Sequence, residues 1–317
     1  MLPSSRVLSP TQFAPAACSV AAVFLWGTSD FAGGYGSRRA NAFTLTAFSH
    51  VCAFALMLVI ALSQHAALPS RQSVLWALLA GAIGGFSLAI FYRALALGQM
   101  GLTAPIAALL GAAIPALADI AMEGAPRRWT IVGFVLAIVA IWLITRPEPA
   151  SGLRSPASTS EKIEVGPEVG PNSESRKAEA GSRPPGVALA ALAGVGFAAF
   201  YLCIHRAHGS SAWIAVVSRV GSFTATAVAV AATRASLTLD RPRVALGMVA
   251  GFLDITASAL FIFASQRGRL DEAVVITSLY PAVTVLLARL VLKEHFSRWR
   301  FVGLLAALAA VPLIAAG

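Results

Sequence analysis

The sequence predicts an all-α, polytopic membrane protein of ten transmembrane helices, built as two inverted five-helix repeats. Three observations lead to this prediction. First, 57% of the 317 residues are hydrophobic and only 12% are charged, with a mean hydropathy of +0.76, which is too apolar for a soluble domain. Second, apolar windows long enough to span a membrane recur along the chain. Third, the second half of the chain repeats the pattern of the first.

A helix needs about 20 mostly apolar residues to cross roughly 30 Å of hydrocarbon. Ten windows meet this condition, at residues 13–36, 42–62, 74–97, 102–122, 129–145, 186–205, 211–233, 243–265, 273–292 and 298–316. The sequence lacks the alternating pattern, about ten residues per pass, that is typical of transmembrane strands. The windows therefore predict a helical bundle.

The character of the chain changes between Arg146 and Pro185. This segment contains no aromatic residue, is rich in Pro, Ser and Gly, and balances its charges, which is typical of a disordered linker. The sequence therefore divides into four parts. They are an N-terminal tail (1–12), a first five-helix repeat (13–145), the linker (146–185) and a second five-helix repeat (186–317).

The two halves match without gaps at a shift of 170 residues, which places Phe91–Ile144 on Phe261–Ile314. Sixteen of these 54 positions are identical, and they include Trp129 with Trp299. Because five spans are an odd number, the second copy must enter the membrane in the opposite orientation. Inverted repeats of this kind recur in secondary transporters, whose substrate sites lie near the bilayer midplane between the halves.

The fourth and fifth spans of the second half read LYPAVTVLLARLVLKEHFSRWRFVGLLAALAAVPLI, with Glu294 before a basic, aromatic turn. This stretch, the Trp26-Gly27 pair in the first span and the five-plus-five plan resemble the EamA-type family of the drug/metabolite transporter superfamily. The resemblance covers residues 22–144 and 187–314. It implies an alternating-access carrier, usually an exporter or permease for small metabolites, amino acids or related compounds, with both termini in the cytoplasm.

Four ionisable residues lie deep in their windows. Asp254 is at the middle of the eighth window, and Asp30 is about 8 Å from the middle of the first. Arg219 and His50 lie about 4.5 Å or less from the middle of the seventh and second windows. A charge at a helix centre costs about 2.5–3.5 kcal/mol on insertion scales, so each side chain must face the bundle interior or a wet cavity.

Two interpretations of these residues remain open. They line a transport path, or Arg219 forms an internal ion pair with Asp254 or Asp30 that holds helices together. In lipid a carboxylate is subject both to the cost of desolvating its charge and to the attraction of nearby cations. Asp30 and Asp254 are therefore candidate proton carriers, and His50 is a third. Arg219 stays charged, and its fork of donors suits either an anionic group of a solute or the role of counter-ion.

Aromatic residues and prolines extend this candidate site. Trp26 lies one helical turn before Asp30, so a ring and an acid face the same space. Pro115 and Pro281 interrupt corresponding spans of the two halves, and paired helix breaks mark a cavity in transporters. Tyr280 precedes Pro281 and offers a hydroxyl or a stacking face. The predicted transport path comprises Trp26, Asp30, His50, Arg219, Asp254 and Tyr280.

Asp119 and Arg289 occupy equivalent positions in the two halves and carry opposite charges. This arrangement suggests a gate pair. Both positions are close to water, and Arg289 also suits the role of an interface anchor.

Other classes of function are not supported by the sequence. The net charge of +10 is spread over single basic residues in short loops, which fits lipid headgroups and not nucleic acid. There is no GxxxxGK[ST] loop for ATP hydrolysis and no pairing of a nucleophile with a base. The three cysteines lack metal-ligand spacing. We therefore expect no catalytic residue, cofactor or metal, and no enzyme activity.

We expect an integral, multi-pass protein of the cell membrane that moves a small-molecule solute, with lipids and protons as further partners. The alternative is a non-transporting assembly or lipid-interacting bundle whose polar residues only pin helices. That alternative predicts a dry midplane in which Asp254 and Arg219 pair with each other. The carrier predicts a water-accessible cavity bordered by Trp26, Asp30 and Tyr280.

Overall fold

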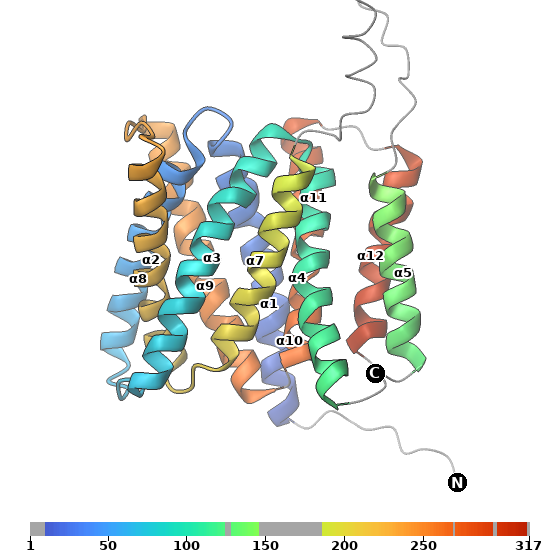
Figure 1. Ribbon diagram of the computed structural model, residues 1–317, viewed down its shortest axis with the longest axis horizontal. Helices are drawn as coiled ribbons and strands as arrows, with labels where there is room; N and C mark the ends of the chain where they lie inside the picture. The colour runs from blue at the N-terminus through green and yellow to red at the C-terminus, as the bar shows by residue number, and fades with distance from the viewer. Residues whose placement is uncertain (1–9, 124–127, 146–185, 269, 294–296, 316–317) are drawn as a thin grey trace, which may run out of the picture.

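The computed structural model describes residues 10–123, 128–145, 186–268, 270–293 and 297–315 (Figure 1). This part of the chain folds into eleven helices. They are α1 (Pro10–Gly36), α2 (Ala42–Ser63), α3 (Arg71–Leu97), α4 (Met100–Glu123), α5 (Arg128–Thr145), α7 (Val187–His205), α8 (Ser211–Ala232), α9 (Arg241–Arg267), α10 (Leu270–Thr277), α11 (Tyr280–Leu292) and α12 (Arg298–Ala315). The predicted linker and Glu294 lie outside the described residues.

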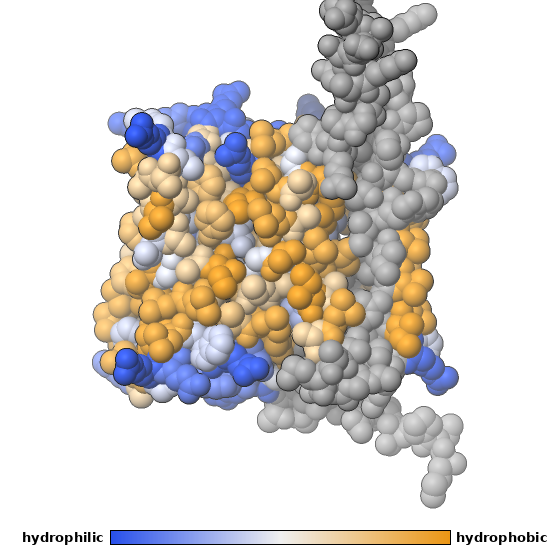
Figure 2. Space-filling model, in the orientation of Figure 1, coloured by the Kyte–Doolittle hydropathy of each residue, from blue (hydrophilic) through white to orange (hydrophobic). Residues whose placement is uncertain are grey.

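Six of the described helices are long and apolar enough to cross a membrane, namely α1, α2, α3, α7, α8 and α9. The other four predicted windows contain α4, α5, the α10–α11 pair and α12. Large apolar side chains such as Phe24, Val59 and Leu290 are exposed on the surface. Figure 2 shows the visible face as an apolar belt with hydrophilic residues gathered at both ends of the helices. Such a surface is solvated by acyl chains rather than by water.

The helix ends repeat at the shift found in the sequence. Ser70 caps the start of α3, and Asp240, 170 residues later, caps the start of α9. Each side chain accepts a hydrogen bond of 3.2 Å from the backbone N–H three residues on, which satisfies a donor that the helix itself leaves free. The same helices end at Gly98 and Gly268, both with extended backbone. The two halves therefore share a backbone plan beyond their sequence identity.

The two halves interlock, so most of the described helices pack mainly on helices of the other half. α1 lies along α9, and in the same way α7 lies along α3. α2 packs on α9, as α8 packs on α3, and α5 packs on α12. In Figure 1, α1 rises from the lower side of the bundle while α7 descends from the upper side. Each pairing of one helix of the first half with one of the second half therefore has a counterpart in which the two halves change places.

Glycines bring two of these helix pairs into close contact. Gly81 of α3 faces the backbone carbonyl of Ser218 on α8, and Gly251 of α9 faces the backbone carbonyl of Ser49 on α2. A methyl group at either glycine would overlap the facing backbone. Small residues allow this approach in membrane helices, where packing and interhelical hydrogen bonds replace the hydrophobic effect. The crossings fix the positions of the residues next to Ser49 and Ser218, which belong to the candidate site.

Candidate functional site

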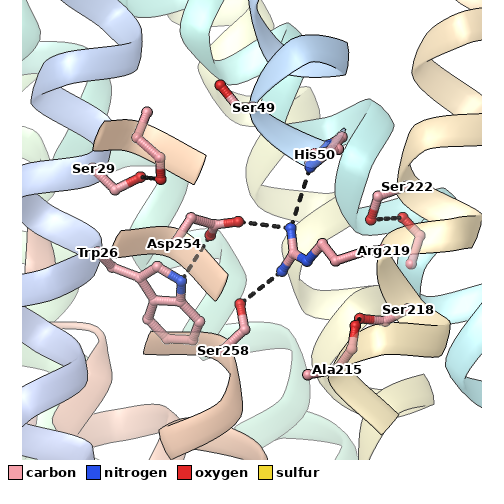
Figure 3. Close-up of polar contacts among 12 residues, drawn as sticks. Trp26, Ser29, Ser49, His50, Ala215, Ser218, Arg219, Ser222, Asp254 and Ser258 are labelled. Atoms are coloured by element: carbon pink, nitrogen blue, oxygen red, sulfur yellow. Dashed lines mark hydrogen bonds and ion pairs between the residues drawn. The ribbon is translucent and has the colours of Figure 1, made fainter. Parts of the chain in front are cut away.

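Arg219 lies at the centre of a buried polar network (Figure 3). Its Nη1 donates a hydrogen bond of 2.6 Å to Oδ2 of Asp254, and its Nη2 donates one of 2.8 Å to Oγ of Ser258. Nη1 also lies 3.3 Å from Nδ1 of His50. The network therefore joins α8, α9 and α2, and it contains a buried ion pair between Arg219 and Asp254.

Asp254 has a second partner on α1. The Nε1–H of Trp26 donates a hydrogen bond of 3.0 Å to Oδ1 of Asp254. Each oxygen of this carboxylate is thus engaged, one by a charged donor and one by a neutral donor. Hydrogen bonds to ionised groups are shorter and stronger than neutral ones, and they offset part of the cost of burying the charge.

The local sequence explains how these side chains meet. Ser258 lies one turn after Asp254 on α9, so both face α8. Arg219 and His50 directly follow Ser218 and Ser49, the two residues at the glycine crossings. Close packing of α8 on α3 and of α9 on α2 therefore brings the guanidinium, the imidazole and the carboxylate to one point.

A cavity of about 50 Å³ adjoins the network. Five of the six residues predicted to line a transport path lie on its wall: Trp26, Asp30, Arg219, Asp254 and Tyr280. His50 does not line it but contacts Arg219, which does. The volume holds about three or four water molecules, whereas pockets for drug-sized ligands measure about 300–1,000 Å³. The structure thus represents a narrow form of the site.

Asp30 differs from Asp254 in its surroundings. The residue is 5% exposed and lines the cavity, yet its side chain forms no hydrogen bond or ion pair with the described residues. The hydroxyl of Tyr280, on the same cavity wall, is also buried and has no hydrogen-bond partner in this part of the chain. The hydroxyl of Ser29, the residue before Asp30, donates its hydrogen bond to the carbonyl oxygen of Ala250, at 2.8 Å, and not to Asp30. The cavity therefore borders one paired carboxylate and one unpaired carboxylate.

Aromatic rings form much of the remaining wall, and Phe261 packs against Trp26 without lining the cavity. The ring centroid of Trp26 lies 5.5 Å from that of Phe261, 6.3 Å from that of Tyr201 and 6.5 Å from that of Tyr280. Sequence reasoning did not find Tyr201, Phe261 or Ser258. Ser258 could have been found from its one-turn spacing to Asp254, but an aromatic residue in a membrane helix gives no such signal.

The two prolines predicted as helix breaks behave differently. α4 continues through Pro115, which corrects the prediction of a break there. A proline removes one hydrogen bond but leaves the turns on either side intact, and membrane helices tolerate it. Pro281 lies in the first turn of α11, just after the break that separates α10 from α11. Neither proline lines the cavity, although Tyr280, next to Pro281, does.

The predicted gate pair of Asp119 and Arg289 stays a prediction. Arg289 is exposed near the end of α11, and the side chain of Asp119 lies outside the described residues. Among the described side chains, no group of three or more His, Cys, Asp or Glu could hold a metal ion.

Comparison with known proteins gave matches at the level of family and fold. The profile of the EamA-like transporter family matches residues 15–146 and again residues 184–316. No curated protein matches the sequence. Among solved structures 22 chains match. One crystal structure of a protein shares 15% sequence identity, with a TM-score of 0.63, over 95% of this chain and 96% of the other. At this identity the similarity shows the fold alone.

Proposed function

The chain belongs to the EamA-like transporter family, and from this premise we propose that it is a proton-coupled carrier that moves a small organic solute by alternating access. Family membership and the apolar helices make it an integral, multi-pass membrane protein of transporter type. The proposal adds the mechanism, the coupling to protons and the residues of the transport path. Lipids surround the apolar belt, and the solute binds between the halves.

An inverted repeat of ten spans is the first element of this proposal, with five spans in residues 13–145, five in 186–317, and the linker 146–185 between them. Three observations support it. The family profile matches once in each half, the helix caps recur 170 residues apart, and the interlocking pairs keep their pattern when the halves are exchanged. Two half-bundles related in this way can rock about a site between them and open it to one side at a time. Both termini then lie on one side, the cytoplasm by our proposal.

A buried ion pair at the wall of a cavity between the halves is the observation that carries the proposal. Arg219 and Asp254 come from the second half, Trp26 from the first, and all three border the same space. Ionisable groups inside a membrane are costly and are retained mainly where they act on a substrate, an ion or a proton. Because the cavity is far smaller than a metabolite site, solute entry requires the halves to separate.

Proton coupling rests on the two carboxylates of the cavity. Asp254 is held by Arg219 and Trp26, while Asp30 has no such partner among the described residues. A carboxylate that meets water on one side of the membrane and desolvation on the other can bind a proton and release it again. In this proposal Asp30, which pairs with no cation among the described residues, carries the proton, and Asp254 serves as the partner of Arg219.

Uptake by proteoliposomes tests the function. Purified protein would be reconstituted under an imposed pH gradient and screened against a panel of small solutes. Transport of one solute should depend on the gradient and should fall to the background of empty vesicles in Asp254→Asn and Asp30→Asn. The control is Asp240→Asn, since Asp240 is exposed and Asn caps a helix as well as Asp does. Unchanged transport and unchanged pH dependence in both membrane variants would remove their proposed role.

A second function, a non-transporting bundle pinned by polar residues, is favoured by one observation. Arg219 and Asp254 do pair with each other, as that alternative expects. It does not account for the unpaired Asp30 beside a cavity. Water access separates the two functions. A cysteine introduced at Ser258 should react with a membrane-impermeant thiol reagent in a carrier after Cys18, Cys52 and Cys203 have been replaced, and should stay unreactive in a dry bundle.

A further inference from the structure

We propose that the solute is an organic cation, a protonated amine on an aromatic or apolar body, and that Asp30 is its counter-charge. This inference rests on the proposed function and deepens it by naming the substrate class. It derives from the balance of charge around the cavity, from the partners of each charged group and from the rings that surround Asp30.

The cavity wall carries two carboxylates, Asp30 and Asp254, and one guanidinium, Arg219. Arg219 is committed to Asp254 through Nη1 and to Ser258 through Nη2. Both oxygens of Asp254 are occupied. The ionisable group of the wall left without a partner among the described residues is therefore the carboxyl group of Asp30, which carries a negative charge once its proton is lost.

This balance decides between the two roles considered for Arg219. The Nε–H of Arg219 has no hydrogen-bond partner among the described residues, but the single charge of the guanidinium is already balanced by Asp254. An anionic solute at Nε would therefore compete with Asp254 for one cation, and at Nη1 it would displace the carboxylate that lies 2.6 Å away. Losing one partner of a buried pair is strongly unfavourable. A cationic solute leaves the existing pair intact and neutralises the unpaired acid. Arg219 therefore acts as the counter-ion of Asp254.

The aromatic residues of the wall favour the same class of solute. Trp26, Tyr201 and Tyr280 line the cavity together with Asp30, and the ring centroids of Tyr201 and Tyr280 lie 6.3 and 6.5 Å from that of Trp26. An ammonium group is attracted to the faces of such rings, and an aromatic or aliphatic body packs against them. The buried hydroxyl of Tyr280, which has no partner in the described part of the chain, can accept a hydrogen bond from the ammonium.

The proposal gives a balanced exchange. In the empty carrier Asp30 is a neutral carboxylic acid, and its O–H bond breaks when the ammonium binds. One proton leaves to water and the carboxylate pairs with the cation, so one positive charge replaces another. The titratable or charged side chains that face Asp30 from the helices around it are Tyr92 of α3, Tyr201 of α7, Arg219 of α8, Asp254 of α9 and Tyr280 of α11.

A set of four probes with one phenyl body tests the charge class: 2-phenylethylammonium, 2-phenylethanol, phenylacetate and phenylalanine. Binding to the full chain in detergent micelles would be followed by the thermal unfolding midpoint and by proton release in weakly buffered solution. We expect 2-phenylethylammonium alone to raise the midpoint, with up to one proton released for each cation bound. Stabilisation by phenylacetate or phenylalanine in preference to the cation would overturn the proposal.

Variants assign the effect to Asp30. Asp30→Asn should weaken cation binding by about 30-fold or more, since a buried charge loses its partner, and should abolish proton release. Asp30→Glu keeps the charge and should restore part of both signals, whereas Asp240→Asn should change neither. Equal binding of the cation by wild type and Asp30→Asn would sink the assignment. If Asp30→Asn does not fold, the probe series and the proton count on the wild type still decide the charge class.

The two proposals fail in different ways. Transport of a neutral, anionic or zwitterionic solute that depends on Asp254 would leave the carrier standing and would overturn the cation class. Cation binding that depends on Asp30, together with no movement of any solute in the uptake panel, would support the class and count against transport.

Discussion

The two halves of the bundle share one backbone plan and differ in the chemistry placed on it. Arg219 lies on the second helix of its half, and His50, 169 residues earlier, occupies the matching place in the first half. Asp254 on α9 matches Gly84 on α3, 170 residues earlier. Helix ends and crossings therefore repeat between the halves, whereas the ion pair belongs to the second half alone.

Contact between equivalent residues explains why the chemistry has to differ. His50 and Arg219 meet each other at the centre of the bundle, with Nδ1 and Nη1 only 3.3 Å apart. Two arginines at these positions would place two positive charges in contact in a medium of low dielectric. A neutral imidazole can instead accept a hydrogen bond from the guanidinium. Where equivalent positions of the two halves touch, their side chains therefore have to differ.

The largest effect should come from removing the guanidinium of Arg219, whose counterpart in the first half is His50. Arg219→Met leaves Asp254 buried without its cation and should lower the free energy of unfolding by about 3–5 kcal/mol. The double variant Arg219→Met/Asp254→Leu removes both charges and should recover most of this loss. Denaturant titration in detergent micelles measures both. A double variant as unstable as the single one would mean that the isolated charge is not the cause.

A smaller loss of stability is expected from substitutions of Trp26 on α1 and Tyr201 on α7, the aromatic residues that the first helix of each half brings to the cavity. Trp26→Phe keeps a ring but removes the N–H that binds Asp254, so it should cost about 1.5–3 kcal/mol, the usual range for a hydrogen bond to a charged group. Tyr201→Phe is the matched control, because Tyr201 forms no hydrogen bond with the described residues. It should change stability little. Equal losses in the two variants would show that ring packing dominates and that the bond to Asp254 contributes little.

The sequence predicted much of this arrangement because depth in a membrane helix can be counted. Asp254 and Arg219 lie near the centres of their windows, and the cost of charge in lipid directs them inward. The shift of 170 residues was visible from Trp129 and Trp299. Partners were harder to predict, since the bond from Trp26 to Asp254 joins residues 228 positions apart and depends on how α1 lies along α9.

The break between α10 and α11, in the ninth window, could not be predicted from the sequence in the same way. Pro115 and Pro281 look alike in sequence, yet α4 continues through the first and α10 ends before the second. A proline disfavours helix in the residue before it and removes one donor, but packing against neighbouring helices decides whether the helix resumes at once. Single residues therefore predict where a break is permitted and not whether it forms.

Substitution of the glycine at each of the two helix crossings should lower the free energy of unfolding by a similar amount. Gly81→Ala and Gly251→Ala each force a methyl group against a backbone carbonyl, of Ser218 and of Ser49, and the backbone cannot yield as a side chain can. Each should lower the free energy of unfolding by about 1–3 kcal/mol. Gly111→Ala is the control, since a methyl group there meets its nearest neighbour at 3.5 Å and helices favour alanine. A loss at only one of the crossings would break the equivalence of the halves.

The helix caps should give the smallest and most equal effects. Ser70→Ala and Asp240→Ala each remove the acceptor for one backbone N–H at the start of α3 or α9, which should cost about 1 kcal/mol in unfolding experiments. Asp240 also pairs with Arg243, but an exposed pair contributes only about 0–1 kcal/mol, so the two losses should stay close at high salt. Asp240→Asn keeps the cap and should lose little. A much larger loss for Asp240→Ala that persists at high salt would mean that the α9 end is held by contacts its counterpart lacks. The backbone plan, and not only the chemistry placed on it, would then differ between the halves.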